Sequence, residues 1–202
     1  MTRAEDVSLA VTLGVDFIGL VFAERSPRRL GIEQALALRA LVPQRIGLVA
    51  LLMDSPRGEI DAIAAALRPD YLQFHGGEDD GFCRGFGLPI LKAIAMGEGD
   101  DPREPMTEFP SAHAFVLDGH ATGEQGGSGR RFDWTLLSAA LDQPFLLAGG
   151  LTQDNVTLAI ATAKPWGVDV ASGIESSPGV KDAEKMRTFV AAVRAADADR
   201  LG

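Results

Sequence analysis

Short apolar runs alternate with amphipathic stretches along the whole chain. The runs have the length and the β-branched content of buried strands, and the stretches between them carry apolar residues at helical spacing. We expect strands at 17–22, 46–52, 71–74, 90–95, 114–117, 145–148 and 167–170. Strands that are apolar on both faces and alternate with helices predict a parallel sheet covered by helices.

The first element of this pattern is a helix. Thr2 and Glu5 have the spacing of a capping box at its start, and Gly14 is expected to end it. A closed barrel needs eight strands, each followed by a helix, and the pattern supplies seven strands. We therefore expect an α/β fold, a (β/α)8 TIM barrel formed by residues 1–202 as a single domain, whose first strand the sequence lacks. An open doubly wound sheet, which can begin with a helix, is the alternative.

The composition of the chain restricts the kinds of partner that we expect for it. The chain has 202 residues, 46% hydrophobic content and a formal charge of −9, which argues against nucleic acid and anionic membranes as partners. Its single cysteine, Cys83, excludes an internal disulfide and fits a reducing compartment. No run approaches the roughly 18 apolar residues of a membrane span. We expect a cytoplasmic monomer that acts on a small molecule.

Polar residues and glycines cluster where the expected strands end, which is where a βα barrel carries its reactive groups. These candidates are Glu24 to Arg29, Asp54, His75, Asp118, the pair Gly149-Gly150 and the pair Ser172-Gly173. The last two pairs follow the final two expected strands, a common location for a phosphate group. Backbone N–H groups there can bind a dianion without any lysine.

Each candidate also has a plainer interpretation. Gly149-Gly150 alone is more often a turn, and Asp118, on position alone, is more often a helix-cap or loop aspartate. His75 is as often a hydrogen-bonded structural residue as a catalytic one. Arg28 can belong to a solvated basic turn, and Cys83 has the surroundings of a packed small residue. No spacing resembles a metal site, so we expect neither metal nor cofactor.

Five segments are distinctive as strings: QFHG (73–76), GGSGRRFDW (126–134), LAGGLTQDNV (147–156), PWGVDVASGIESSPGVKD (165–182) and FAERSPRRL (22–30). The first four resemble the signature segments of the phosphoribosylanthranilate isomerase family, and the last is similar to the family's loop after strand 2. The resemblance runs in order from Met1 to about Val193. It implies an isomerase of tryptophan biosynthesis. The implied reaction is the Amadori rearrangement of N-(5-phosphoribosyl)anthranilate to 1-(o-carboxyphenylamino)-1-deoxyribulose 5-phosphate.

The resemblance also implies roles for individual residues. Asp118 matches the family's general acid, which protonates the furanose ring oxygen. Arg28 matches the arginine that binds the anthranilate carboxylate, and Asp169 matches another active-site position that contacts substrate. Gly149, Gly150, Ser172 and Gly173 match the phosphate-binding residues. The loop 126–129 matches a lid that excludes water.

One departure from the family concerns the general base. The family has a cysteine in a Cys-Gly-(Leu/Met)-Thr-Arg segment at the end of strand 1, and Met1-Thr2-Arg3 matches only the tail of that segment. We expect the cysteine two positions before Met1 and the first strand before it, because of a misassigned start or a true truncation. Cys83 is expected on an outer helix and cannot replace that cysteine.

Two further interpretations remain open. One is another phosphate-binding barrel, such as an indole-glycerol-phosphate synthase or a sugar-phosphate epimerase. Those enzymes need a catalytic lysine on an early strand or a metal-binding histidine set, and neither is evident in the sequence. The other is a non-catalytic, seven-stranded remnant that binds phosphorylated ligands or a partner.

Overall fold

Seven parallel strands form one sheet in the computed structural model, which describes residues 1–97, 99–119, 132–137 and 141–201. They pair in sequence order, each with the next along the chain. The strands are β1 (Phe17–Val21), β2 (Gly47–Leu52), β3 (Tyr71–Phe74), β4 (Ile90–Ala95), β5 (Ala114–Asp118), β6 (Phe145–Leu147) and β7 (Gly167–Val168). All seven predicted strands are present, although β7 is shorter than the predicted 167–170 because the chain turns into a 3-10 helix soon after it.

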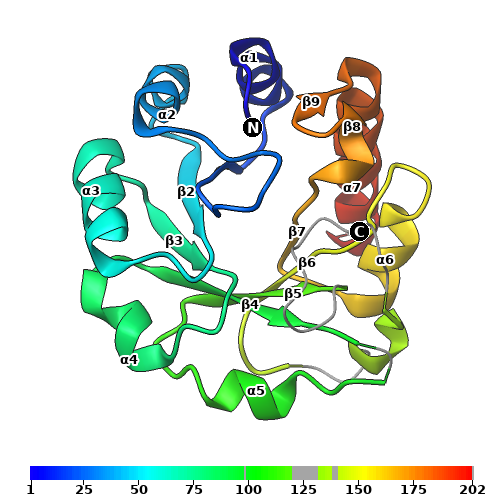
Figure 1. Ribbon diagram of the computed structural model, residues 1–202. Helices are drawn as coiled ribbons and strands as arrows, with labels where there is room; N and C mark the ends of the chain where they lie inside the picture. The colour runs from blue at the N-terminus through cyan, green and yellow to red at the C-terminus, as the bar shows by residue number, and fades with distance from the viewer. Residues whose placement is uncertain (98, 120–131, 138–140, 202) are drawn as a thin grey trace.

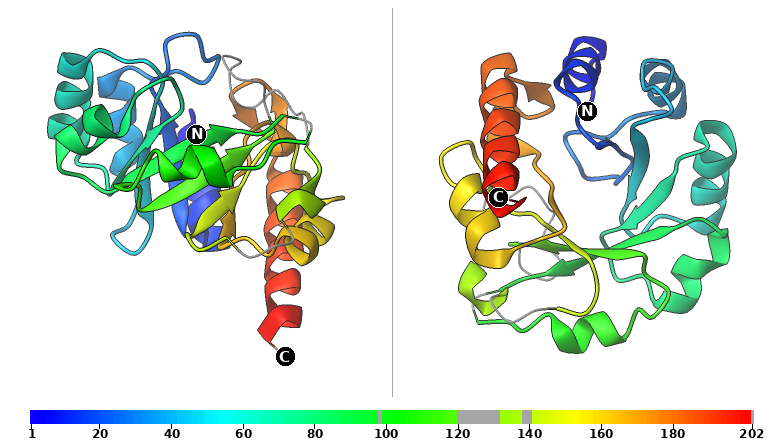
Figure 2. Two further views of the ribbon diagram at one scale, coloured as in Figure 1. Left: turned by 90° about the horizontal axis from the view of Figure 1, so that it is seen from below. Right: turned by 180° about the vertical axis from the view of Figure 1, so that it is seen from behind.

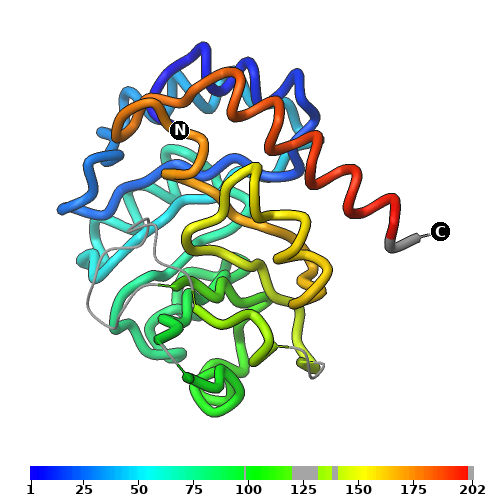
Figure 3. The backbone as a smooth tube through the Cα atoms, turned by 90° about the vertical axis from the view of Figure 1, so that its right-hand side faces the viewer, coloured from blue at the N-terminus to red at the C-terminus, as the bar shows by residue number. Residues whose placement is uncertain are grey.

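The helices lie outside the curved sheet, in a ring around it (Figure 1). They are α1 (Ala4–Leu13), α2 (Ile32–Arg39), α3 (Arg57–Leu67), α4 (Asp80–Cys83), α5 (Arg103–Thr107), α6 (Val156–Ala163) and α7 (Ala183–Leu201), with 3-10 helices η1 (Arg84–Phe86), η2 (Trp134–Leu137) and η3 (Ser172–Ile174). The far end of α7 extends beyond the neighbouring elements (Figure 3). Among the described residues, no helix is long and apolar enough to cross a membrane.

The start of α1 differs from the predicted capping box. Arg3 is the N-cap residue and makes no capping hydrogen bond, and the hydroxyl of Thr2, one residue before it, donates to the carbonyl oxygen of Gly179. The capping-box prediction is therefore wrong, because the helix begins one residue later than a box with Thr2 as its N-cap requires. Gly14 ends the helix in the left-handed region, with φ 70°, as predicted.

Alternate residues of each strand belong to two different buried layers. One set packs against the helices and includes the fully buried Leu48, Leu72 and Phe115. The other set faces the inside of the curved sheet and is smaller; it consists of Val49, Leu91, Ala93, Ala114, Val116 and Ala148. The sheet is thus apolar on both faces, which explains why its strands read as continuous apolar runs.

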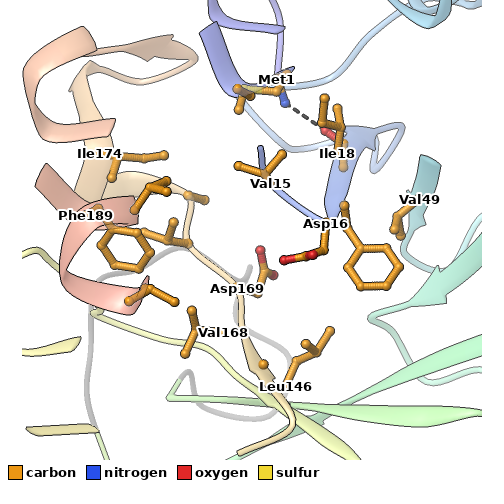
Figure 4. A pocket seen from close by; sticks show the side chains of 18 of the residues that line it. Met1, Val15, Asp16, Ile18, Val49, Leu146, Val168, Asp169, Ile174 and Phe189 are labelled. Carbon is orange, nitrogen blue, oxygen red and sulfur yellow. Dashed lines mark hydrogen bonds between the residues drawn. The ribbon is translucent and has the colours of Figure 1, made fainter. Parts of the chain in front are cut away.

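An apolar groove separates the two outermost strands, β1 and β7, which do not pair with each other in the described structure. It has a volume of about 640 Å³, and α7 and the segment before β1 also line it (Figure 4). Seen from behind, α7 lies beside α1, the helix that precedes β1 (Figure 2). Residues 17, 19 and 21 of β1 face the groove and are half-buried or exposed, whereas Ile18 and Leu20 are buried against helices. The seven strands therefore form an incomplete ring.

A two-stranded antiparallel hairpin, which the sequence pattern does not predict, lies beside α1 at one end of the groove (Figure 1). Its strands are β8 (Glu175–Ser177) and β9 (Val180–Lys181). Thr2 and Asp6 bind it, the latter by accepting a hydrogen bond of 3.2 Å from the Lys181 backbone N–H. Strands of two or three residues have no detectable periodicity, and only the Pro178-Gly179 turn signals them.

Candidate active site

Asp118 is the last residue of β5 and lies at the carboxyl edge of the sheet, as the sequence predicts. His75 follows β3, and its Nε2 atom lies 3.5 Å from Oδ2 of Asp118. Both side chains are buried, with exposed fractions of 6% and 8%. A carboxyl group and an imidazole at this distance can exchange or share a proton, so the pair has the composition of an acid–base centre.

Because Gly149 has no side chain, the Asp118 carboxylate has room beside it. Gly149 has φ 83°, which glycine adopts without strain, and a Cβ atom there would lie 2.8 Å from Oδ1 of Asp118 and would clash with the backbone nitrogen of Gly119. Any larger residue at position 149 would therefore displace the candidate acid. This requirement gives the first glycine of the pair a specific structural reason, beyond that of a simple turn.

The loops after β6 and β7 pack against each other. Gly173, in η3, lies so close to the first loop that a Cβ atom would clash with the carbonyl oxygen of Leu151. Asn155 fixes that loop by donating to the Gly150 carbonyl (2.9 Å) and by accepting from the Thr152 N–H (2.9 Å). The structure thus brings together the two glycine-containing pairs that the sequence singled out.

Four backbone N–H groups in these loops are available to an anion. Within the described residues, those of Gly149, Gly150, Ser172 and Gly173 donate no hydrogen bond to another backbone group or to a side chain. Ser172 also begins η3, so its N–H points away from the turn that follows. An arrangement of this type can bind a phosphate dianion through the backbone alone.

Asp169 follows β7 and points into the groove (Figure 4). Its side chain is accessible to solvent there, although protein surrounds it on the other sides. That surrounding protein, and next to it the Asp118 carboxylate, raise the pKa of Asp169, and Lys181 opposes the shift. Solvent in the open groove weakens the effect.

Arg28, predicted to bind a substrate carboxylate, pairs with a carboxylate of the protein. Its Nε and Nη2 atoms donate to the two oxygens of Glu175, at 2.8 and 2.7 Å. Lys181 donates to the same carboxylate at 3.0 Å. Burial tends to raise the pKa of Glu175, but the hydrogen bonds from Arg28 and Lys181 outweigh it and lower the pKa.

Sequence reasoning missed Glu175 and Lys181. Both lie in the segment 165–182, where they stand six residues apart without any pattern of their own. The hairpin turn is what brings them together, because Glu175 and Lys181 are paired residues of β8 and β9. The signal that could have revealed them is therefore the Pro-Gly turn between two charged residues of opposite sign.

Two further candidates make structural contacts. The carboxylate of Asp54 accepts a hydrogen bond of 2.8 Å from the Gly77 N–H, which fixes the loop after β3. Cys83 is the last residue of α4, is 1% exposed, and burial raises the pKa of its thiol to about 12. The predicted lid, 126–129, lies outside the described residues. Where the structure is described, no group of His, Cys, Asp and Glu could hold a metal ion.

A parallel βα sheet with a carboxylic acid, an arginine and glycine-containing loops at its strand ends is the arrangement typical of enzymes of the (β/α)8-barrel type. Comparisons with known proteins show the family. The family model described as N-(5'phosphoribosyl)anthranilate (PRA) isomerase matches residues 1–192, and the chain belongs to this family.

Individual relatives agree with that assignment. The N-(5'-phosphoribosyl)anthranilate isomerase of Xanthomonas campestris is 48% identical over an alignment that covers 100% of this chain and 93% of the relative. The crystal structure of the isomerase from Thermus thermophilus superposes with a TM-score of 0.86 at 31% identity, covering 96% of both chains. Another isomerase structure contains reduced 1-(o-carboxyphenylamino)-1-deoxyribulose 5-phosphate. That protein is 28% identical to this chain and superposes with a TM-score of 0.84, and the match covers 96% of this chain and 95% of that one.

Proposed function

We propose that this protein catalyses the Amadori rearrangement of N-(5-phosphoribosyl)anthranilate to 1-(o-carboxyphenylamino)-1-deoxyribulose 5-phosphate in tryptophan biosynthesis. The observation that carries the proposal is the 48% identity to a named isomerase over the whole chain. The grouping of Asp118, Arg28 and the two glycine-containing loops at one edge of the sheet supports it.

The reaction needs an acid at the ring oxygen of the sugar. In our proposal Asp118 donates a proton to that oxygen, the C1–O bond breaks, and the nitrogen lone pair forms a Schiff base at C1. His75, 3.5 Å away, is placed to return a proton to Asp118. A base then removes the proton from C2, which gives an enol-amine, and tautomerisation of this species yields the ketone.

The other predicted residues hold the two ends of the substrate. The N–H groups of Gly149, Gly150, Ser172 and Gly173 bind the phosphate, and Arg28 binds the anthranilate carboxylate. Asp169 accepts a hydrogen bond from a sugar hydroxyl between them; its position in the groove, facing the same interior as Asp118, supports this role.

We further propose that the active form has an eighth strand in the groove between β1 and β7, which closes a (β/α)8 barrel. The apolar lining, the exposed inner positions of β1 and the volume of about 640 Å³ support this placement. This strand would end in Cys-Gly, with the cysteine as the general base for C2. We expect the protein to be one domain that acts as a monomer in the cytoplasm.

Nuclear magnetic resonance of the sugar protons tests the proposed reaction. The substrate has a single proton at its anomeric carbon, whereas C1 of the product is a methylene group. We expect the anomeric signal to disappear when the protein is supplied with the eighth strand, and to persist with the Asp118→Asn variant. Binding of the reduced product without any loss of the anomeric signal would instead favour a non-catalytic phosphate-binding protein.

A further inference from the structure

Arg28 has two hydrogen-bonding edges, and Glu175 occupies only one of them. A guanidinium group carries five N–H bonds in a plane, which form a side edge (Nε and Nη2) and an end edge (Nη1 and Nη2). Glu175 accepts from the side edge, at 2.8 and 2.7 Å. Nη1 has no acceptor among the residues that the structure describes. The end edge is therefore able to bind a second carboxylate without displacing the first.

The surroundings keep the Arg28–Glu175 pair in one geometry. The exposed side-chain fractions are 12% for Arg28 and 5% for Glu175, so the pair is largely shielded from water. Arg28 nevertheless follows β1 at the carboxyl edge of the sheet, and 12% of its side chain stays exposed, so a molecule bound at that edge can reach it. A bidentate pair in such a position fixes the orientation of the guanidinium plane. An unpaired arginine side chain, which has many rotamers, leaves that orientation free.

Lys181 is the second basic residue beside Glu175. Its Nζ atom donates to Glu175 at 3.0 Å and to the carbonyl oxygen of Ala171 at 2.8 Å, and its side chain is 5% exposed. Glu175 therefore lies between two basic side chains, and Lys181 offsets part of the negative charge that Glu175 places beside Arg28.

We propose that Glu175 is a positioning residue for carboxylate recognition: it holds the side edge of Arg28 and aims the end edge at the carboxylate of the substrate. The inference rests on the proposed function of Arg28 and adds to it the residue that orients the guanidinium. It predicts that Glu175 contributes to affinity only for ligands that carry this carboxylate, and only through Arg28.

Two ligands that differ by one group test the inference. The first is the reduced product found in the related isomerase structure, and the second is the same compound with a phenyl ring that lacks the carboxylate. Calorimetry would measure both affinities for the protein and its R28A, E175Q and R28A/E175Q variants, with and without the added eighth strand. Glu59→Gln is the matched control, because Glu59 pairs with the adjacent Arg29 at 3.4 Å on the exposed surface.

We expect the unsubstituted protein to prefer the carboxylate ligand and E175Q to lose that preference by about tenfold or more, as for a misaligned charge-assisted pair. Affinity for the ligand without the carboxylate should stay within about twofold. In the R28A background, E175Q should change neither affinity, and E59Q should behave as the unsubstituted protein. Should E175Q not fold, E175D replaces it, since the shorter side chain keeps the charge and cannot reach the side edge.

Two results would overturn the inference alone: an E175Q variant that keeps the full preference, or one that weakens both ligands equally, as a purely structural residue would. If the unsubstituted protein binds the two ligands equally, the error lies in the proposed function and not in the role of Glu175. In that case Arg28 does not bind the carboxylate.

Discussion

The middle of the sheet and its two outermost strands differ in how the inner face is covered. In the middle, called the paired side because each strand there has two neighbours, the inward-facing Leu91 and Ala93 of β4 are 2% and 7% exposed. On the open side, formed by β1 and β7, the corresponding positions of β1 are half-buried or exposed, although the strand is equally apolar. The inner face of a curved sheet is buried by the strands opposite to it, so an apolar strand is covered only where the ring around it is complete.

The same contrast applies to the chemistry. The candidate acid, Asp118, is on the paired side, 5% exposed and next to His75. The proposed base belongs to the open side, in the groove that Asp169 also faces. The proposed acid is thus already enclosed by the seven strands. The proposed base, in contrast, depends on the eighth strand that would fill the groove.

The largest effect is expected from closing the groove. A strand added before Met1 and ending in Cys-Gly should raise turnover by about 10²–10⁴-fold, the usual contribution of a positioned base. It should also raise the midpoint of urea unfolding, because it pairs the free edges of β1 and β7. The same strand ending in Ala-Gly should raise the midpoint alone. Equal turnover by the 202-residue chain without any strand would contradict the proposal.

The Asp118→Asn substitution tests the enclosed side directly. We expect kcat of the strand-completed protein to fall by about 10²–10⁴-fold, because the amide cannot donate the acid proton to the ring oxygen, while KM changes by only a few fold. Steady-state kinetics measures both constants. Near-normal turnover in a folded variant would remove Asp118 from the mechanism.

Two inward-facing residues sharpen the comparison in terms of stability. Leu91 on β4 is 2% exposed, and Leu91→Ala should lower the free energy of unfolding by about 2–5 kcal/mol. Phe17 on β1 is only partly buried and packs against Tyr71, so Phe17→Ala should cost about 1 kcal/mol. Urea unfolding of the 202-residue chain gives both values. Comparable losses would show that the open side is as well packed as the paired side.

The smallest effect is expected at Cys83. With a pKa of about 12, only about one thiol in 10⁴ is ionised at pH 8, so native Cys83 should react with iodoacetamide far more slowly than the same residue in urea. Cys83→Ala should leave turnover of the strand-completed protein unchanged. A large loss of turnover, with the fold intact, would mean that this thiol takes part in the reaction.

The sequence predicted the seven parallel strands because each is a continuous apolar run, and it predicted Asp118 and both glycine-containing loops because they follow such runs. It did not predict the hairpin, whose strands are too short to show a period. It also missed the partner of Arg28, since an ion pair across 147 residues leaves no local trace. The capping box at Thr2 failed for a related reason, because Thr2 contacts the distant Gly179 and the helix begins one residue later than the box requires.

The contacts of the hairpin at the end of the groove determine the stage of folding at which it can dock. Its partners lie early in the chain: Thr2 binds Gly179, Asp6 binds the backbone of Lys181, and Arg28 binds Glu175 across sequence separations of 177, 175 and 147 residues. On a ribosome, the first helix must wait until most of the chain has emerged before these contacts can form. Closing such long loops is also entropically slow, so docking of the hairpin should be a late step in folding.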